Sequence, residues 1–469
     1  MIQIDNELTP AALQPALDHL FALSGEKIHH LQKRWDSKRG TPVFTVKGEY
    51  TSRGWTEWTQ GFQFGAPIYQ FEITRDEAFL EIGRRATVDF MASHVTHTGV
   101  HDHGFNNVST YGNLLRLMSA GIIPFNPWEK NFYELALKAS GAVQAARWTT
   151  LTPELGYIYS FNGPHSLFAD TIRSLRSLAL AHRLGHKLMG EMDRPISLLE
   201  RLVQHAETTA RYAVYFGTGR DAYDIRGRTA HESIFNVNDG AYRCPNSQQG
   251  YSPFSTWTRG LAWILCGYPE QIEFLEVLSE EELAPLGGKD KLIARFLEVA
   301  TAVADFYLEY TPIDGVPYWD TGAPGLAKLG DYLDRPAEPF NAHEPVDSSA
   351  AAIAAQGLLR LGSYLKRNLH IAKGNRYYQA GLTVAKSLFR EPYLSTNPAH
   401  EGLLLHSVYH RPNGWDYIPQ GQQVPCGESS MWGDYHAREL GVFIDRAAKG
   451  QGEPRFFDVV EYVPQMAKG

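Results

Sequence analysis

Apolar side chains recur at three- and four-residue steps along most of this chain, which is the spacing of one face of an α-helix. Residues 194–215 show the pattern most clearly, and Pro195 is suited to a first helical turn. The apolar face of that stretch consists of Leu199, Leu202, Val203, Ala206, Ala210, Ala213 and Val214. We expect further helices near 7–23, 60–72, 76–94, 105–119, 130–146, 167–184, 255–268, 289–309, 347–364, 374–389 and 429–447.

Most of these stretches are separated by short segments rich in Gly, Pro, Asn or Asp. Short connections favour antiparallel neighbours, so about a dozen helices would form six hairpins around one axis. We therefore predict an all-α (α/α)6 barrel, although periodicity alone does not distinguish it from an open helical array. No Pro/Ser-rich linker divides the chain, and we expect residues 1–469 to form a single catalytic domain.

Strand-like patterns are confined to segments between the predicted helices. They cover 157–161, 233–244 with a turn at Asn238-Asp239-Gly240, and 402–412, and we expect them at one rim of the barrel. Residues 321–345 form the longest expected loop. Because long loops in compact domains are often functional, we expect this one to border the site.

Composition limits the classes of partner. The net charge is −8 and there is no long basic run, which argues against nucleic acid and against an anionic membrane surface. The three cysteines form no CxxC pair, which fits a reducing compartment better than a disulfide framework or a metal site. The N-terminal segment lacks the pattern of a secretory signal, so we expect a cytoplasmic protein, either a monomer or a homodimer.

Two segments carry chemistry that packing alone does not require: HDHGF at 101–105 and QGYSPFSTWTRGLAW at 249–263. A site for an acidic sugar needs a flat aromatic face, a fixed hydrogen-bonding group and a cation for the carboxylate. Trp257, Gln249 and Arg259 would supply these three in turn. A buried Arg259 could equally be paired with an Asp or Glu of the protein, and a Trp is also common in a barrel core.

The order of several motifs resembles the unsaturated glucuronyl hydrolases of glycoside hydrolase family 88. The motifs are WTEWTQGFQFG (55–65), HDHGF (101–105), FADTIRSL (168–175), QGYSPFSTWTRGLAW (249–263), VPYWD (316–320), DSSAAAIAAQGLL (347–359) and MWGDYH (431–436). The resemblance spans roughly residues 50–440. The related unsaturated rhamnogalacturonyl hydrolases of family 105 share the barrel but usually lack HDxGF.

The resemblance implies an (α/α)6 barrel that releases a 4,5-unsaturated uronic acid from the non-reducing end of oligosaccharides left by polysaccharide lyases. The reaction it implies is hydration of a vinyl ether: a carboxylic acid protonates C4, water adds at C5, and the hemiketal opens and expels the glycan. Asp102 and Asp170 match the two central carboxyls. His101, His231 and Trp58 match substrate contacts, with Trp55 as an alternative to Trp58.

The residues around the two aspartates are consistent with this interpretation, although either aspartate could simply cap a helix. Asp102 lies between His101 and His103, and beside a cationic imidazole we expect it to stay ionised. Asp170 follows Phe168 and Ala169, where partial burial would raise its pKa and make it the general acid and base. We expect Asp347 and Ser348 to cap a helix rather than to act in catalysis.

Some positions depart from the family pattern. Pro253 and Phe254 stand where acidic residues are usual, and Phe161 stands where a tryptophan is usual, so we expect a less polar pocket and an altered substrate. Other functions remain open: an inverting glycosidase on saturated glycosides, or a catalytically silent glycan-binding protein. We see no nucleotide or metal motif and expect no cofactor and no metal.

Overall fold

The periodic stretches of the sequence form helices in the computed structural model, which describes residues 1–54, 57–368 and 370–458. The helices are α1 (Gln14–Arg34), α2 (Gln60–Thr74), α3 (Glu77–Phe90), α4 (Ala92–Val95), α5 (His103–Asn107), α6 (Asn113–Ser119), α7 (Pro127–Ala146), α8 (Thr171–Ser174), α9 (Arg176–Arg183), α10 (Leu198–Tyr212), α11 (Thr258–Glu276), α12 (Glu280–Leu283), α13 (Lys289–Glu309), α14 (Ser348–Arg367), α15 (Ile371–Leu388) and α16 (Met431–Ala448). A π-helical turn, Val108–Gly112, joins α5 to α6.

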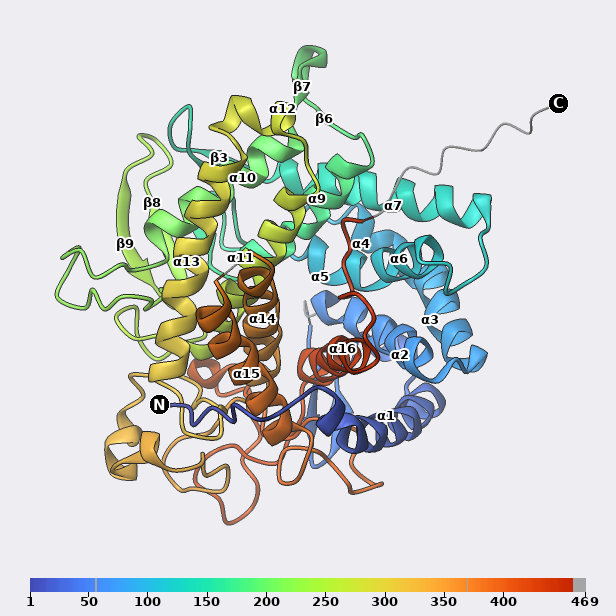
Figure 1. The fold of residues 1–469 in the computed structure, drawn as a ribbon, viewed down its shortest axis with the longest axis vertical. Helices are drawn as coiled ribbons and strands as arrows, with labels where there is room; N and C mark the ends of the chain where they lie inside the picture. Colours follow the sequence, from blue (N-terminus) through green and yellow to red (C-terminus); the bar gives the residue numbers. More distant parts are fainter. Residues whose placement is uncertain (55–56, 369, 459–469) are drawn as a thin grey trace.

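Helices that contact one another in sequence order close a ring (Figure 1). The inner ring consists of α2, α5–α6, α8–α9, α11, α14 and α16, and α16 packs back on α2. Each inner helix is preceded by an outer helix, and these are α1, α3, α7, α10, α13 and α15. Six such pairs form the (α/α)6 barrel that the sequence predicts.

The inner and outer helices of the barrel differ in amino-acid composition. In α14 every residue from Ser348 to Leu365 is buried, and many of them are Ala, Gly or Ser, which let neighbouring helices approach closely. Asp347 caps this helix, as predicted, by accepting hydrogen bonds from the backbone N–H groups of Ser349 and Ala350. The outer helix α10 instead buries one face, as its amphipathic pattern predicts.

Three predicted helix starts are wrong. The helix expected from 167 begins at Thr171, because Ser166–Phe168 forms a strand. The first helix covers Gln14–Arg34 rather than 7–23, and it continues through Gly25, where a Cβ atom would lie only 3.2 Å from Gln70 and from Phe79. That glycine permits close packing and does not end the helix. Helix α10 begins at Leu198 with Ser197 as its N-cap, while Pro195 lies in a short strand.

The strands are short and lie between helices: β1 (Phe44–Val46), β2 (Glu49–Thr51), β3 (Trp148–Thr150), β4 (Gly156–Ile158), β5 (Ser166–Phe168), β6 (Leu188–Met189), β7 (Pro195–Ile196), β8 (Glu232–Phe235) and β9 (Tyr242–Asn246). The predicted strands near 157–161 and 233–244 are confirmed. The stretch 402–412 forms only isolated bridges at Leu404 and Leu405, so the strand predicted there is wrong.

One small sheet has the order β5-β8-β9. Phe168 pairs with Glu232 at the edge of this sheet, and the Ala169 N–H donates to the His231 carbonyl over 2.9 Å. The pairing therefore brings Asp170, which follows directly, beside the β8 segment.

Within the described residues, no helix is both long and apolar enough to cross a membrane. Cys244, Cys266 and Cys426 are all free thiols, as expected from their spacing.

Candidate active site

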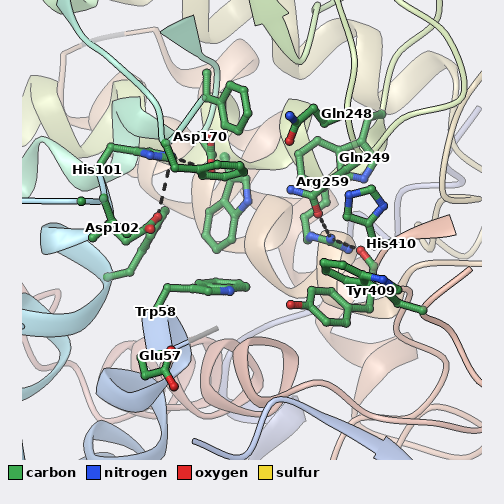
Figure 2. Close-up of a pocket in the computed structure, with 18 of the residues that line it drawn as sticks. Glu57, Trp58, His101, Asp102, Asp170, Gln248, Gln249, Arg259, Tyr409 and His410 are labelled. Carbon is green, nitrogen blue, oxygen red and sulfur yellow. Dashed lines mark hydrogen bonds and ion pairs between the residues drawn. The ribbon is translucent and has the colours of Figure 1, made fainter. Parts of the chain in front are cut away.

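A cavity of about 370 Å³ opens where α5, α8 and α11 begin. The side chains that line it come from segments far apart in the sequence (Figure 2). They are Glu57, Trp58, His97, Gly99, Val100, His101, Asp102, Phe105, Phe161, Phe168, Asp170, Gln248, Gln249, Trp257, Arg259, Trp263, Tyr409, His410 and Trp415. Aromatic walls with a few convergent polar groups are typical of a small-molecule site.

His101 lies between the two predicted carboxyls (Figure 2). Its Nε2 atom is 3.7 Å from an Asp102 oxygen and 3.6 Å from an Asp170 oxygen. All three residues are at least 90% buried. Asp102 and Asp170 occupy the N-cap positions of α5 and α8, yet neither side chain makes a capping hydrogen bond. Both carboxyls are thus directed to His101 and the cavity instead of to helix capping.

The electrostatics reverse the expected order of the two aspartate pKa values. Burial raises the pKa of Asp102, and the nearby charge of Asp170 adds to this effect. Burial alone would also raise the pKa of Asp170, but the nearby His101 imidazole lowers it. His101 itself has a raised pKa, because its two carboxylate neighbours outweigh its burial. Asp170 is therefore the more acidic of the two carboxyls, and the prediction that burial raises the pKa of Asp170 is wrong for the unliganded site.

His231 does not line the cavity but lies directly behind its wall. Its ring packs against Trp257 and Phe168, with centroid separations of 4.5 and 4.6 Å. Burial lowers the pKa of His231 to about 3, so the imidazole is neutral. Its Nδ1 atom accepts hydrogen bonds from the backbone N–H groups of Gln248 and Gln249, at 3.1 and 3.3 Å. The proton is therefore on Nε2, a buried donor for which the described residues provide no acceptor.

Arg259 lines the cavity, but its charge is paired inside the protein. One terminal nitrogen, Nη1, is 2.8 Å from the Asp347 carboxylate. The other, Nη2, donates to the Gln249 side-chain oxygen over 2.9 Å and to the Tyr409 carbonyl over 2.8 Å. The structural-pair interpretation of Arg259 is thus confirmed. The same contacts fix the amide plane of Gln249 at the cavity wall.

Both predicted stacking tryptophans line the cavity. Trp257 is 2% exposed, and its Nε1–H lacks an acceptor among the described residues. Trp58 is half-buried and stacks on Trp432 with ring centroids 5.1 Å apart. The alternative, Trp55, lies outside the described residues.

The departures from the family pattern affect the cavity unequally. Phe161 lines it and is 40% exposed. Pro253 and Phe254 do not line it, and Phe254 stacks on Tyr223 at 4.8 Å, so the expectation that they make a pocket wall less polar is wrong. The loop 321–345 contributes no lining residue either. It folds instead into 3-10 turns, one of which is held by Glu344.

Sequence patterns missed several lining residues, notably Gln248, Tyr409, His410 and Trp415. Tyr409 and His410 belong to the stretch that resembled a strand, and their backbone N–H groups donate to the carboxylate of Asp416. Their aromatic and polar composition, in a segment without helical periodicity, is the signal that could have identified them.

The residue types of the His101, Asp102 and Asp170 cluster are also found in metal sites. One donor atom from each of His101, Asp102 and Asp170 lies within 4.8 Å of the others, so this set could hold a cation. A proton-transfer reaction needs no metal, and our expectation of a metal-free enzyme stays a prediction.

No protein-family model matches the chain. Two relatives are similar to the chain over most of its length. The unsaturated glucuronyl hydrolase of Bacillus sp. (strain GL1) is 26% identical over 401 residues, which is 84% of this chain and 88% of that protein. The unsaturated glucuronyl hydrolase of Formosa agariphila is 23% identical over 386 residues, which is 82% of this chain and 78% of that protein.

The solved structure of the Bacillus sp. GL1 enzyme superimposes with a TM-score of 0.70 at 22% identity, and the match covers 94% of this chain and 99% of that one. This match confirms the barrel fold. The sequence relatives confirm the resemblance that the motifs indicated: across most of its length, this chain is similar to the unsaturated glucuronyl hydrolases.

Proposed function

We propose that this protein is a glycoside hydrolase that releases a 4,5-unsaturated uronic acid from the non-reducing end of lyase-generated oligosaccharides. The observation that carries the proposal is the convergence of Asp102, Asp170 and His101 at the base of an aromatic-lined cavity. Its sequence relatives are named for the same reaction, and the Bacillus sp. GL1 structure is described as responsible for the degradation of glycosaminoglycan.

In the proposed reaction Asp170 gives a proton to C4 of the unsaturated sugar. Water adds at C5 and returns a proton to the Asp170 carboxylate, and the resulting hemiketal opens and expels the rest of the glycan. Asp170 must be protonated for the first step, whereas the unliganded site favours its ionised form. A bound uronate brings a third carboxylate beside the cluster, and a like charge raises the pKa of its neighbours. Substrate binding would thus supply the protonated acid.

The remaining wall residues would bind the sugar. Trp257 and Trp58 would stack on sugar rings, while Gln249, held by Arg259, would bond a hydroxyl group or the attacking water. His231 would contribute its Nε2–H from behind the wall after a small shift of the rings that cover it. Asp102 and His101 would balance charge around Asp170.

Two other functions fit the geometry less well. In an inverting glycosidase the two carboxyls stand about 6.5–9.5 Å apart to admit a water molecule. In this site the Asp102 and Asp170 oxygens that approach His101 lie within 4.8 Å of each other. A silent glycan-binding protein would not need two buried carboxyls turned into the same cavity, since an unneeded buried charge is costly.

We further propose that the whole chain works as one catalytic domain, in the cytoplasm, as a monomer or homodimer. The three free thiols are consistent with a reducing compartment.

The test follows the ultraviolet absorbance of the conjugated double bond while the purified protein acts on unsaturated disaccharides. We expect wild type to remove the absorbance, and Asp170→Asn to lower kcat by about 10²–10⁴-fold, the usual contribution of a general acid. Asp102→Asn should also have a lower kcat than wild type. Both variants should keep the melting temperature of wild type to within a few degrees. Near-normal turnover by Asp170→Asn would remove Asp170 from the mechanism.

A further inference from the structure

Solvent exposure divides the cavity into a base and a mouth. At the base, His101, Asp102, Asp170, Trp257 and Arg259 are each 8% exposed or less. The mouth is formed by the lining residues that are half-buried or exposed: Glu57, Trp58, His97, Gly99, Val100, Phe161, Gln248, Gln249 and Trp415. If the proposed function holds, the terminal uronate reacts at the base, and the sugar next to it lies between the mouth residues.

The mouth is aromatic and carries a carboxylate. Trp58, Phe161 and Trp415 present rings, and Gln248 presents an amide that donates to Asn162 over 2.7 Å. Glu57 also lines the cavity and lies next to Trp58, on the side away from His101 and Asp170 (Figure 2). Rings of this kind stack on the apolar face of a neutral sugar, whereas a carboxylate repels an anionic substituent.

Fixed positive charge is absent from the lining residues of the mouth that the structure describes. Arg259 is the one Lys or Arg among the described lining residues, and it lies at the base bound to Asp347. Arg53 is near the mouth but does not line it; it lies against the Trp415 ring at 5.2 Å and donates to the Trp415 carbonyl. The net charge of −8 acts in the same direction as Glu57 over longer distances.

We propose that the mouth selects a neighbouring sugar that carries no sulfate, and that Glu57 is the residue that disfavours sulfated substrates. This inference rests on the proposed function and adds the class of the second sugar. A sulfate placed among these residues would lose its water shell without gaining a cation, and it would approach the Glu57 carboxylate. Specificity would thus come from repulsion as well as from stacking.

The test compares two unsaturated chondroitin disaccharides that differ only in a 6-sulfate on the hexosamine. We expect wild type to favour the unsulfated disaccharide by about 10-fold or more in kcat/KM, because like charges at close range cost about this much. Glu57→Gln should lower the ratio of kcat/KM for the unsulfated disaccharide to kcat/KM for the sulfated one. Glu57→Lys should lower this ratio further or bring it below one. Phe161→Ala should raise KM for both disaccharides.

The matched control is Glu309→Lys, which makes the same change in net charge at an exposed residue that does not line the cavity. Its ratio should equal that of wild type. Equal or faster hydrolysis of the sulfated disaccharide by wild type, or the same kcat/KM ratio in Glu57→Lys as in wild type, would overturn the inference.

Calorimetric binding of both disaccharides to Asp170→Asn separates the two proposals. If wild type hydrolyses neither disaccharide, the proposed function fails. A binding preference for the unsulfated disaccharide would still support the selection by Glu57.

Discussion

At the scale of single residues, the environment of a carboxyl decides its charge more than its neighbours in the sequence do. Asp102 and Asp170 share His101, yet their pKa values move in opposite directions, because the attraction of His101 outweighs burial at Asp170 but not at Asp102. The sequence identified both aspartates and the adjacent imidazole. It could not give the pKa values, since these depend on how deeply each carboxyl is buried and on which charges the fold places around it.

Asp320 gives a prediction at the same scale. Its carboxylate accepts the Tyr251 and Gly322 N–H groups, each over 2.8 Å, and so anchors the segment that carries Gln249. Burial raises the pKa of Asp320 to about 6, above the value of about 3.9 in an unfolded chain. Between these values the folded chain binds the proton more tightly, so the free energy of unfolding falls as pH rises and levels off above about pH 6.

Urea unfolding of wild type and Asp320→Asn across about pH 4.5–7 measures this effect. The variant should lack this part of the decline, so the difference in unfolding free energy between the two proteins should change by about 2 kcal/mol over the range. Parallel curves would show that Asp320 does not titrate there.

At the scale of elements, the close contact of α5 with α8 positions the two aspartates. A Cβ atom at Gly104 would lie 2.2 Å from the Ser174 carbonyl oxygen and 2.5 Å from its Cα atom. Gly104→Ala must therefore move the two helices apart and separate Asp102 from Asp170. We expect a loss of about 1–3 kcal/mol in unfolding free energy and a fall in kcat/KM larger than this destabilisation explains.

Gly112→Ala is the control, since it lies in the same helical run and its nearest neighbours are side-chain atoms of Val108 at 3.0 Å or more. Its stability and activity should change little. If Gly104→Ala retained full activity, the contact between α5 and α8 would not position the aspartates.

The elements also show what a sequence pattern can predict. Helical periodicity located almost every long helix, because burial of a stripe at regular spacing is a local property. It misplaced α1 and the start of α10. Gly25 lies inside α1, where it allows close packing against Gln70 and Phe79, and Pro195 lies in a short strand before α10. Both features depend on contacts with other segments of the chain, which a local pattern does not contain. The segment with Tyr409 and His410 was missed as a cavity wall because Asp416, rather than a repeating pattern, fixes its backbone.

At the scale of the whole molecule, the ring closes through α16 on α2, so the first and last inner helices depend on each other. A closed ring with one continuous core should unfold cooperatively. We expect calorimetry to record one transition whose calorimetric and van't Hoff enthalpies agree. Two separated transitions would contradict our prediction of a single domain.

The central claim is that water adds across a double bond instead of displacing the glycan at the anomeric carbon, and the reaction in D₂O tests it most directly. If Asp170 protonates C4, nuclear magnetic resonance of the released sugar should show one deuterium at C4, and Asp170→Asn should yield almost none. Release of the glycan with no deuterium at C4 and an intact double bond would contradict the account and indicate direct displacement.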